Sequence, residues 1–76
     1  MLHVIVTSPE RLLYEGPAHR VAFPGEQGVF EVLPMHRPLI SRLQAGALEI
    51  NDAVIPISRG IVRVADDVVT AVVEMG

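Results

Sequence analysis

Short apolar segments alternate with turn-forming residues along the whole chain, and this spacing limits the possible folds more than any other feature. Val, Ile and Leu dominate the apolar half of the sequence, and β-branched side chains favour a pleated, half-buried strand. In the first segment, Leu2, Val4 and Val6 recur with the period of two that is typical of a strand with one buried face. The pattern predicts an all-β fold, a β-sandwich of two antiparallel or mixed sheets with about eight to ten short strands.

The strands and turns of this sandwich can be assigned along the chain. The predicted strands are Leu2–Thr7, Arg11–Glu15, His19–Phe23, Val29–Leu33, Ala47–Ile50, Ala53–Ile57, Ile61–Val64 and Val68–Val73, and a mostly apolar segment with Leu39, Ile40 and Leu43 crosses to Ala45 and Gly46. The predicted turns or breaks are Ser8–Glu10, Gly16–Pro17, Asn51–Asp52, Ser58–Gly60 and Asp66–Asp67. Pro56 is expected on a sheet edge, because proline has no N–H for a ladder hydrogen bond. Leu39, Ile40 and Leu43 have helical spacing, but their segment is short and ends at a glycine, so no helix is predicted.

Composition excludes several functions for this single domain of 76 residues. The net charge is −3 and all six basic residues are arginine, which argues against a binder of nucleic-acid phosphates. A lipoyl or biotinyl carrier and a phosphate-binding P-loop each need a lysine, and the chain has none. Without cysteine there is neither a disulfide nor a thiolate metal site. Met1–Thr7 lacks the features of a signal peptide, and no apolar run approaches the ~18 residues of a membrane span.

Candidate catalytic and metal-binding residues form no recognisable motif. The serines lie outside any nucleophile elbow, and the irregular spacing of the histidines does not suggest a zinc site. Asp66 and Asp67 are better explained as a polar hairpin turn than as a cation site. The candidates considered were Ser8, Ser41, Ser58, His3, His19 and His36. We therefore expect a protein with no enzymatic activity, no cofactor and no metal, whose serines and histidines are solvated.

The stretch Pro24–Ile40 combines strand and turn residues in an unusual way. It holds three of the six prolines and two of the six glycines, interleaved with the apolar run Val29–Leu33. Proline and glycine at such a density make a shaped, projecting surface of the kind that binds a partner. Alternation places Val29 on the face opposite Phe30 and Val32. Phe30, Val32 and Leu33 are predicted to hold the sandwich together.

The same stretch and the residues after it resemble a known family. The residues that carry the resemblance are Pro24, Gly25, Gly28, Phe30, Val32, Leu33, Pro34, His36, Pro38, Leu39, Ile40, Leu43, Gly46, Leu48 and Ile50. Together they resemble the N-terminal β-sandwich of the epsilon subunit of F-type ATP synthase, called delta in mitochondria. The resemblance covers essentially the whole chain and stops before that family's C-terminal helical hairpin. Hydrolysis restraint and ATP binding, which the hairpin provides, are not expected of these residues.

The resemblance implies a non-catalytic central-stalk subunit that couples the gamma subunit to the membrane c-ring for proton-driven ATP synthesis. Such a subunit would be peripheral, on the cytoplasmic face of the energy-transducing membrane, and would meet the membrane only through partner subunits. By position in the motif, the c-ring contacts would be Glu26, Gln27, Gly28 and Val29, and the gamma contacts His36, Arg37, Ser41 and Arg42. Glu31, Met35 and Arg37 depart from the family pattern, where small residues are common, and add charge and bulk at this surface.

Two alternatives from other functional classes remain open at this point. A free-standing small β-barrel that binds a ligand in its mouth would have a lined pocket. A small hydrolase would have a cluster of titratable groups with perturbed pKa values in a cleft. The stalk-subunit interpretation predicts an exposed patch around the central stretch instead.

Overall fold

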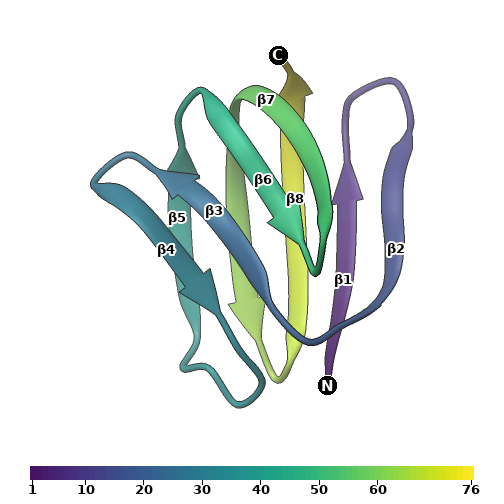
Figure 1. Ribbon diagram of the computed structural model, residues 1–76, viewed down its shortest axis with the longest axis vertical. Helices are drawn as coiled ribbons and strands as arrows, with labels where there is room; N and C mark the ends of the chain where they lie inside the picture. Colours follow the sequence, from purple (N-terminus) through teal and green to yellow (C-terminus); the bar gives the residue numbers. More distant parts are fainter.

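The computed structural model describes residues 1–76, and all its regular elements are strands (Figure 1). Their bounds are β1 Leu2–Thr7, β2 Leu12–Ala18, β3 Val21–Gly25, β4 Gly28–Val32, β5 Leu39–Leu43, β6 Gly46–Ile50, β7 Ala53–Ala65 and β8 Val68–Met75. The predicted all-β class and the strand number are confirmed, and the segment with helical spacing forms β5. No helix is present that is long and apolar enough to cross a membrane.

The eight strands form one mixed sheet that folds into two layers. The first layer has the order β2-β1-β8-β7-β5, and the second has the order β7-β6-β3-β4, which lies in front of it in Figure 1. Only β1 and β8 run parallel, and every other pair is antiparallel. The layers share β7 and meet again where Gly25 of β3 pairs with Leu43 of β5. The predicted pair of sheets is therefore one sheet whose longest strand belongs to both halves.

The predicted turn at Ser58–Gly60 is wrong, because β7 continues through it. The first part of β7 pairs with β6, and the second part lies between β5 and β8. The register with β8 shifts between Ile57 and Arg59, so the strand bends without ending. A Cβ on Gly60 would lie 2.7 Å from the Val72 carbonyl oxygen, which shows how closely β7 and β8 approach at the bend. Gly60 therefore allows two strands to pack closely and does not reverse the chain.

The predicted break at Gly16–Pro17 is also wrong. Strand β2 continues to Ala18 and pairs with β1 as far as Leu2. Because β2 is the outermost strand of its layer, the missing N–H of Pro17 can face solvent without loss of a ladder bond. Pro56 does not lie on an edge strand as predicted, because β7 pairs with β6 on one side, and on the other the Pro56 carbonyl accepts a bond from the Gly76 N–H (3.1 Å), just after the end of β8.

The hairpin turns at the other predicted positions are confirmed. Asn51, between β6 and β7, has φ +50°. Asp66 and Asp67, between β7 and β8, have φ +52° and +61°. Asn and Asp tolerate this left-handed region better than other side chains, which explains why they form these two turns.

The core lies between the layers and consists of 16 buried residues. All eight strands contribute to it, and β2 does so only through its last residue, Ala18. Phe23 is fully buried and stacks on Phe30, with ring centroids 5.5 Å apart. Full burial of a side chain of this size contributes about 1.5–3 kcal/mol. Phe30 packs against the core and Val32 lies within it, as predicted. Leu33 does not: it follows the last residue of β4 and is 49% exposed.

Candidate interaction surface

An exposed row of side chains crosses the outer face of the first layer. Arg42 of β5 is in register with Ile61 of β7, Ile61 with Val72 of β8, and Val72 with Thr7 of β1. Residues in register on neighbouring strands project from the same face of a sheet. Ile61 and Val72 are 47% and 45% exposed, so this row presents aliphatic side chains to solvent.

A second row runs beside the first. Ile40 of β5 is in register with Arg63 of β7, and Arg63 with Thr70 of β8. Ile40 is 70% exposed, and Val68 on the same face of β8 is exposed too. We call this surface the apolar face, and it consists of Ile40, Arg42, Ile61, Arg63, Val68 and Val72. An antiparallel sheet in solution normally carries polar side chains on its outer face, so the aliphatic side chains on both faces of β7 and β8 make the apolar face a candidate interaction surface.

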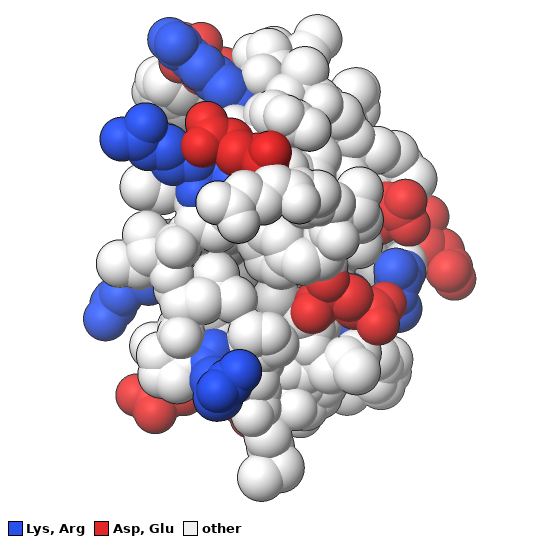
Figure 2. Space-filling view, turned by 90° about the vertical axis from the view of Figure 1, so that its left-hand side faces the viewer, with Lys and Arg blue, Asp and Glu red and all other residues white.

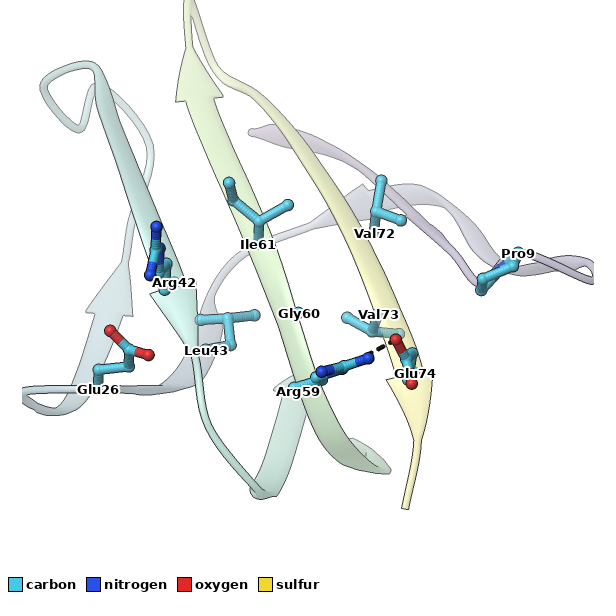
Figure 3. Close-up of a pocket in the computed structure, with 10 residues that line it drawn as sticks. All are labelled: Pro9, Glu26, Arg42, Leu43, Arg59, Gly60, Ile61, Val72, Val73 and Glu74. Carbon is cyan, nitrogen blue, oxygen red and sulfur yellow. Dashed lines mark hydrogen bonds and ion pairs between the residues drawn. The ribbon is translucent and has the colours of Figure 1, made fainter.

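One end of the apolar face is hollowed into a shallow depression of about 440 Å³. Figure 3 shows Ile61 and Val72 on adjacent strands above it, with Arg42 and Glu26 on one side and Arg59 on the other. The Arg59 Nε donates a hydrogen bond to Glu74 Oε2 (2.9 Å), whereas no carboxylate lies within ion-pair distance of Arg42. The depression therefore offers apolar contacts and one cation without an ion-pair partner.

Sequence and structure comparisons agree on one family. The family model described as the ATP synthase delta/epsilon chain β-sandwich domain matches residues 1–75. The chain belongs to this family. The ATP synthase epsilon chain of Leptospira borgpetersenii is 37% identical over 79 residues, which cover 99% of this chain and 62% of that protein. The epsilon chain of Nitratiruptor sp. is 40% identical over 78 residues, which cover 96% of this chain and 60% of that protein. The chain thus spans about three fifths of the length of these relatives.

Solved structures share the fold of this delta/epsilon sandwich. A chain in the mitochondrial ATP synthase central stalk and c-ring of Tetrahymena thermophila superposes with a TM-score of 0.82 at 15% identity, covering 96% of this chain and 63% of that one. A chain in the Euglena gracilis mitochondrial ATP synthase superposes with a TM-score of 0.86 at 23% identity, covering 95% and 49%. At these identities the likeness concerns the fold.

The residues predicted to meet the c-ring lie together at one end of the delta/epsilon sandwich. Glu26 and Gln27 form the turn between β3 and β4, and Gly28 and Val29 begin β4. All four are exposed, and Val29 projects on the side opposite the core. Pairing of this turn with β5 fixes its position, because the Glu26 N–H donates to the Arg42 carbonyl (3.3 Å). A second depression of about 500 Å³ runs from this turn along the edges of β4 and β5.

The residues predicted to meet gamma are separated by the structure. His36 and Arg37 lie in the loop before β5, and Arg42 lies near the far end of β5, beside Glu26. Ser41 and Arg42 are neighbours on a strand, so they face opposite sides of it. Arg42 projects from the apolar face, whereas Ser41 is half-buried. Since Glu26 and Arg42 line the same depressions, the two predicted contact groups adjoin each other.

The opposite face of the delta/epsilon sandwich, called the polar face below, carries a cluster of ion pairs beside the exposed Val54. Arg20 Nε donates to Glu31 Oε2 (2.6 Å), and its Nη1 donates to the Asn51 carbonyl (3.1 Å) and lies 3.8 Å from Glu49 Oε1. The hydrogen bond to Glu31 raises the pKa of Arg20 above its ordinary value. Glu31, which departs from the family pattern, thus has an ion-pair partner within this chain and lies away from the apolar face. Figure 2 views the molecule from the left-hand side of Figure 1, where charged groups of both signs are scattered over an otherwise uncharged surface.

Sequence reasoning missed Ile61, Val68 and Val72 as surface residues. The signal was present in the segment Val68–Val73, where apolar residues occupy both strand faces in place of strict alternation. Such a strand has two covered faces, and only one of them can be the sandwich core. The sequence does not say which face is the outer one, because that depends on the layer to which the strand belongs.

The candidate catalytic residues do not converge. Ser8 is 7% exposed and not solvated as predicted, since its hydroxyl accepts bonds from the N–H groups of Glu10 (3.3 Å) and Arg11 (3.2 Å) in the β1–β2 turn. His3 lies 3.6 Å from Glu15, and the His36 Nδ1 lies 2.6 Å from the Arg37 carbonyl. No three His, Asp or Glu side chains gather in a geometry suited to a metal ion. The space between the layers is filled by the core, and the depressions lie at the surface.

Proposed function

We propose that this sandwich is the non-catalytic central-stalk domain of an F-type ATP synthase, which couples the gamma subunit to the c-ring during proton-driven ATP synthesis. The observation that carries this proposal is the apolar face: aliphatic side chains and two arginines on the outside of a sheet whose inside is already packed. Membership in the delta/epsilon family supports this choice of partners, as does the likeness to a chain in a central stalk and c-ring assembly. The work of such a domain is mechanical, so it needs interfaces and no active site.

Gamma is the partner that we assign to the apolar face. A standard interface buries about 800 Å² per partner and depends on a few well-packed anchors, among which arginine is common. Ile61 and Val72 would form the centre of the contact, and Arg42 would contribute a cation without an ion-pair partner at its rim. His36 and Arg37 would extend the contact beyond the start of β5.

The turn between β3 and β4 is our candidate for the c-ring contact. Glu26, Gln27, Gly28 and Val29 project at one end of the sandwich, and their backbone is tied to β5. A tip fixed in this way can transmit force from one partner to the other through β5 and β7. The domain would lie peripherally at the cytoplasmic face of the membrane and would reach it only through the c-ring.

A pair of substitutions on one strand tests the gamma assignment. Ile61 and Val54 are exposed aliphatic residues of β7, but Ile61 projects from the apolar face and Val54 from the polar face, where it is in register with Glu49. We expect Ile61→Asp to weaken binding to gamma from the same organism about ten- to hundredfold, because it puts a charged group in place of an aliphatic one at the centre of the contact, and the new carboxylate would compete with gamma for Arg42, which is in register with it. Val54→Asp has the same chemistry and should leave affinity unchanged. Titration calorimetry with the purified chains gives the comparison.

The control for this pair is the thermal stability of both variants, which should fall by small amounts because both positions are exposed, and by more in Val54→Asp, whose carboxylate would lie opposite Glu49. Absence of binding by the unaltered chain, or equal loss in both variants, would refute the assignment.

For the c-ring tip, Val29→Asp should preserve gamma affinity and lower proton-coupled ATP synthesis in the assembled enzyme. If Val29→Asp loses affinity for gamma, then the turn between β3 and β4 belongs to the gamma contact and not to the c-ring contact.

A further inference from the structure

The loop between β4 and β5 begins with a tight turn that holds a methionine in an unfavourable backbone conformation. The His36 N–H donates to the Leu33 carbonyl (3.1 Å), which closes a four-residue turn over Pro34 and Met35. Proline in the second position and a positive φ in the third are the features of a type II turn. The third position normally takes glycine or asparagine, yet Met35 has φ +68° there.

Met35 is exceptional among the positive-φ residues of this chain. The other non-glycine residues with positive φ are Asn51, Asp66 and Asp67, whose short polar side chains tolerate the left-handed region. A long aliphatic side chain has no such compensation. Met35 therefore costs the folded state free energy that glycine at the same position would not.

The side chain of Met35 makes little packing contact within the domain. It is 89% exposed, more than any other large apolar side chain of the protein. Leu33, at the start of the same turn, is 49% exposed, so two apolar side chains project next to each other. Strain at a residue whose side chain packs against nothing in its own domain points to a role outside the domain.

The turn holds the backbone of Met35 in a defined place. The Met35 N–H donates to Asp67 Oδ1 (2.6 Å), and the Asp67 carbonyl accepts a bond from the His3 N–H (2.9 Å). Asp67 lies in the β7–β8 turn, so the bond ties the loop to the two strands that carry most of the apolar face. An anchor fixed before binding loses little conformational entropy on association.

We propose that Met35 is an anchor residue that inserts into an apolar pocket of the subunit covering the apolar face, and that it sets affinity for that partner without supporting the fold. This inference rests on the proposed function, because it assigns Met35 to the gamma contact. Two observations favour that partner. The β7–β8 turn that holds Met35 leads directly to Val68 of the apolar face, and the loop leads through Pro38 to Ile40, the most exposed aliphatic member of that face.

The variant Met35→Gly tests separately whether Met35 supports the fold and whether it binds gamma. Glycine relieves the positive φ, so the melting temperature should stay the same or rise by roughly 2–6 °C. The anchor is lost, so affinity for gamma should fall about tenfold in titration calorimetry. Met35→Leu keeps an aliphatic side chain at the same strained position and should retain affinity to within about threefold.

The outcomes that overturn this inference differ from those that overturn the proposed function. If Met35→Gly lowers the melting temperature by several degrees, the methionine supports the fold and the inference fails. If Met35→Gly binds gamma as tightly as the unaltered chain while Ile61→Asp does not bind, the inference fails and the proposed function stands. If the unaltered chain does not bind gamma but forms a dimer that Met35→Gly abolishes in sedimentation, the pocket belongs to a second copy, and both proposals fail.

Discussion

The two outer faces of the sandwich carry different side chains, although strand β7 contributes to both. Strand β7 places Val54 on one face, beside the ion pairs of Arg20 with Glu31 and Glu49, and places Ile61 on the other, between Arg42 and Val72. On the polar face the charged groups have partners within the chain, and Val54 is exposed beside them. On the apolar face several aliphatic side chains from neighbouring strands are exposed together. Our proposal therefore leaves the first face to solvent and gives the second to a partner subunit.

The largest expected effect comes from the core that both faces share. Phe23→Ala should lower the free energy of unfolding by about 3–5 kcal/mol, because it removes a fully buried ring and its stacking contact with Phe30. In a domain of 76 residues this is a large fraction of the total stability. Urea unfolding followed by circular dichroism measures the change. A loss below about 1 kcal/mol would mean that the layers are not held together by this pair.

A smaller effect is expected where β7 passes from one layer to the other. Gly60→Ala would place a Cβ 2.7 Å from the Val72 carbonyl oxygen and 2.9 Å from a methyl group of Val73. The backbone must shift to make room, so we expect a loss of about 1–3 kcal/mol in the same urea experiment. Since Val72 belongs to the apolar face, gamma affinity should fall as well. Unchanged affinity together with lost stability would show that the bend and the interface are independent.

The smallest effect is expected on the polar face. Arg20→Ala removes the ion pairs with Glu31 and Glu49, which are solvent-exposed, so it should lower the melting temperature only slightly and leave gamma affinity unchanged. Arginine is charged throughout neutral pH, so added salt and not pH should weaken the contribution of Arg20 in this range. Calorimetric scans at low and high salt check this. A loss of gamma affinity in Arg20→Ala would contradict the assignment of this face to solvent.

The sequence predicts the fold class well because period-two alternation and turn residues are local signals. It predicts the turns at Asn51 and Asp66, where the residue type determines the backbone conformation. It fails at Gly60 and Pro17, because a glycine or a proline marks a turn, a bend or an edge equally well, and only the neighbouring strand decides which. The core position of Leu33 is mispredicted for a related reason, since β4 ends one residue earlier.

The interaction surface was predictable only in part. The family resemblance located Arg42 and the turn at Glu26, but it assigned them to different partners, although the structure places them side by side. Ile61 and Val72 could not be recognised as surface residues because their exposure depends on which strands lie on either side of β7 and β8. The strain at Met35 was likewise hidden, since it depends on the backbone of a turn that the sequence marks only through Pro34.

The most direct test of the two-face account is a methyl NMR titration of this chain with gamma. On addition of gamma, the methyl signals of Ile61, Val72 and Ile40 should shift or broaden, whereas those of Val54, on the same strand as Ile61 but on the polar face, should stay in place. The contradicting result is perturbation of Val54 without perturbation of Ile61 and Val72, which would mean that the partner covers the polar face.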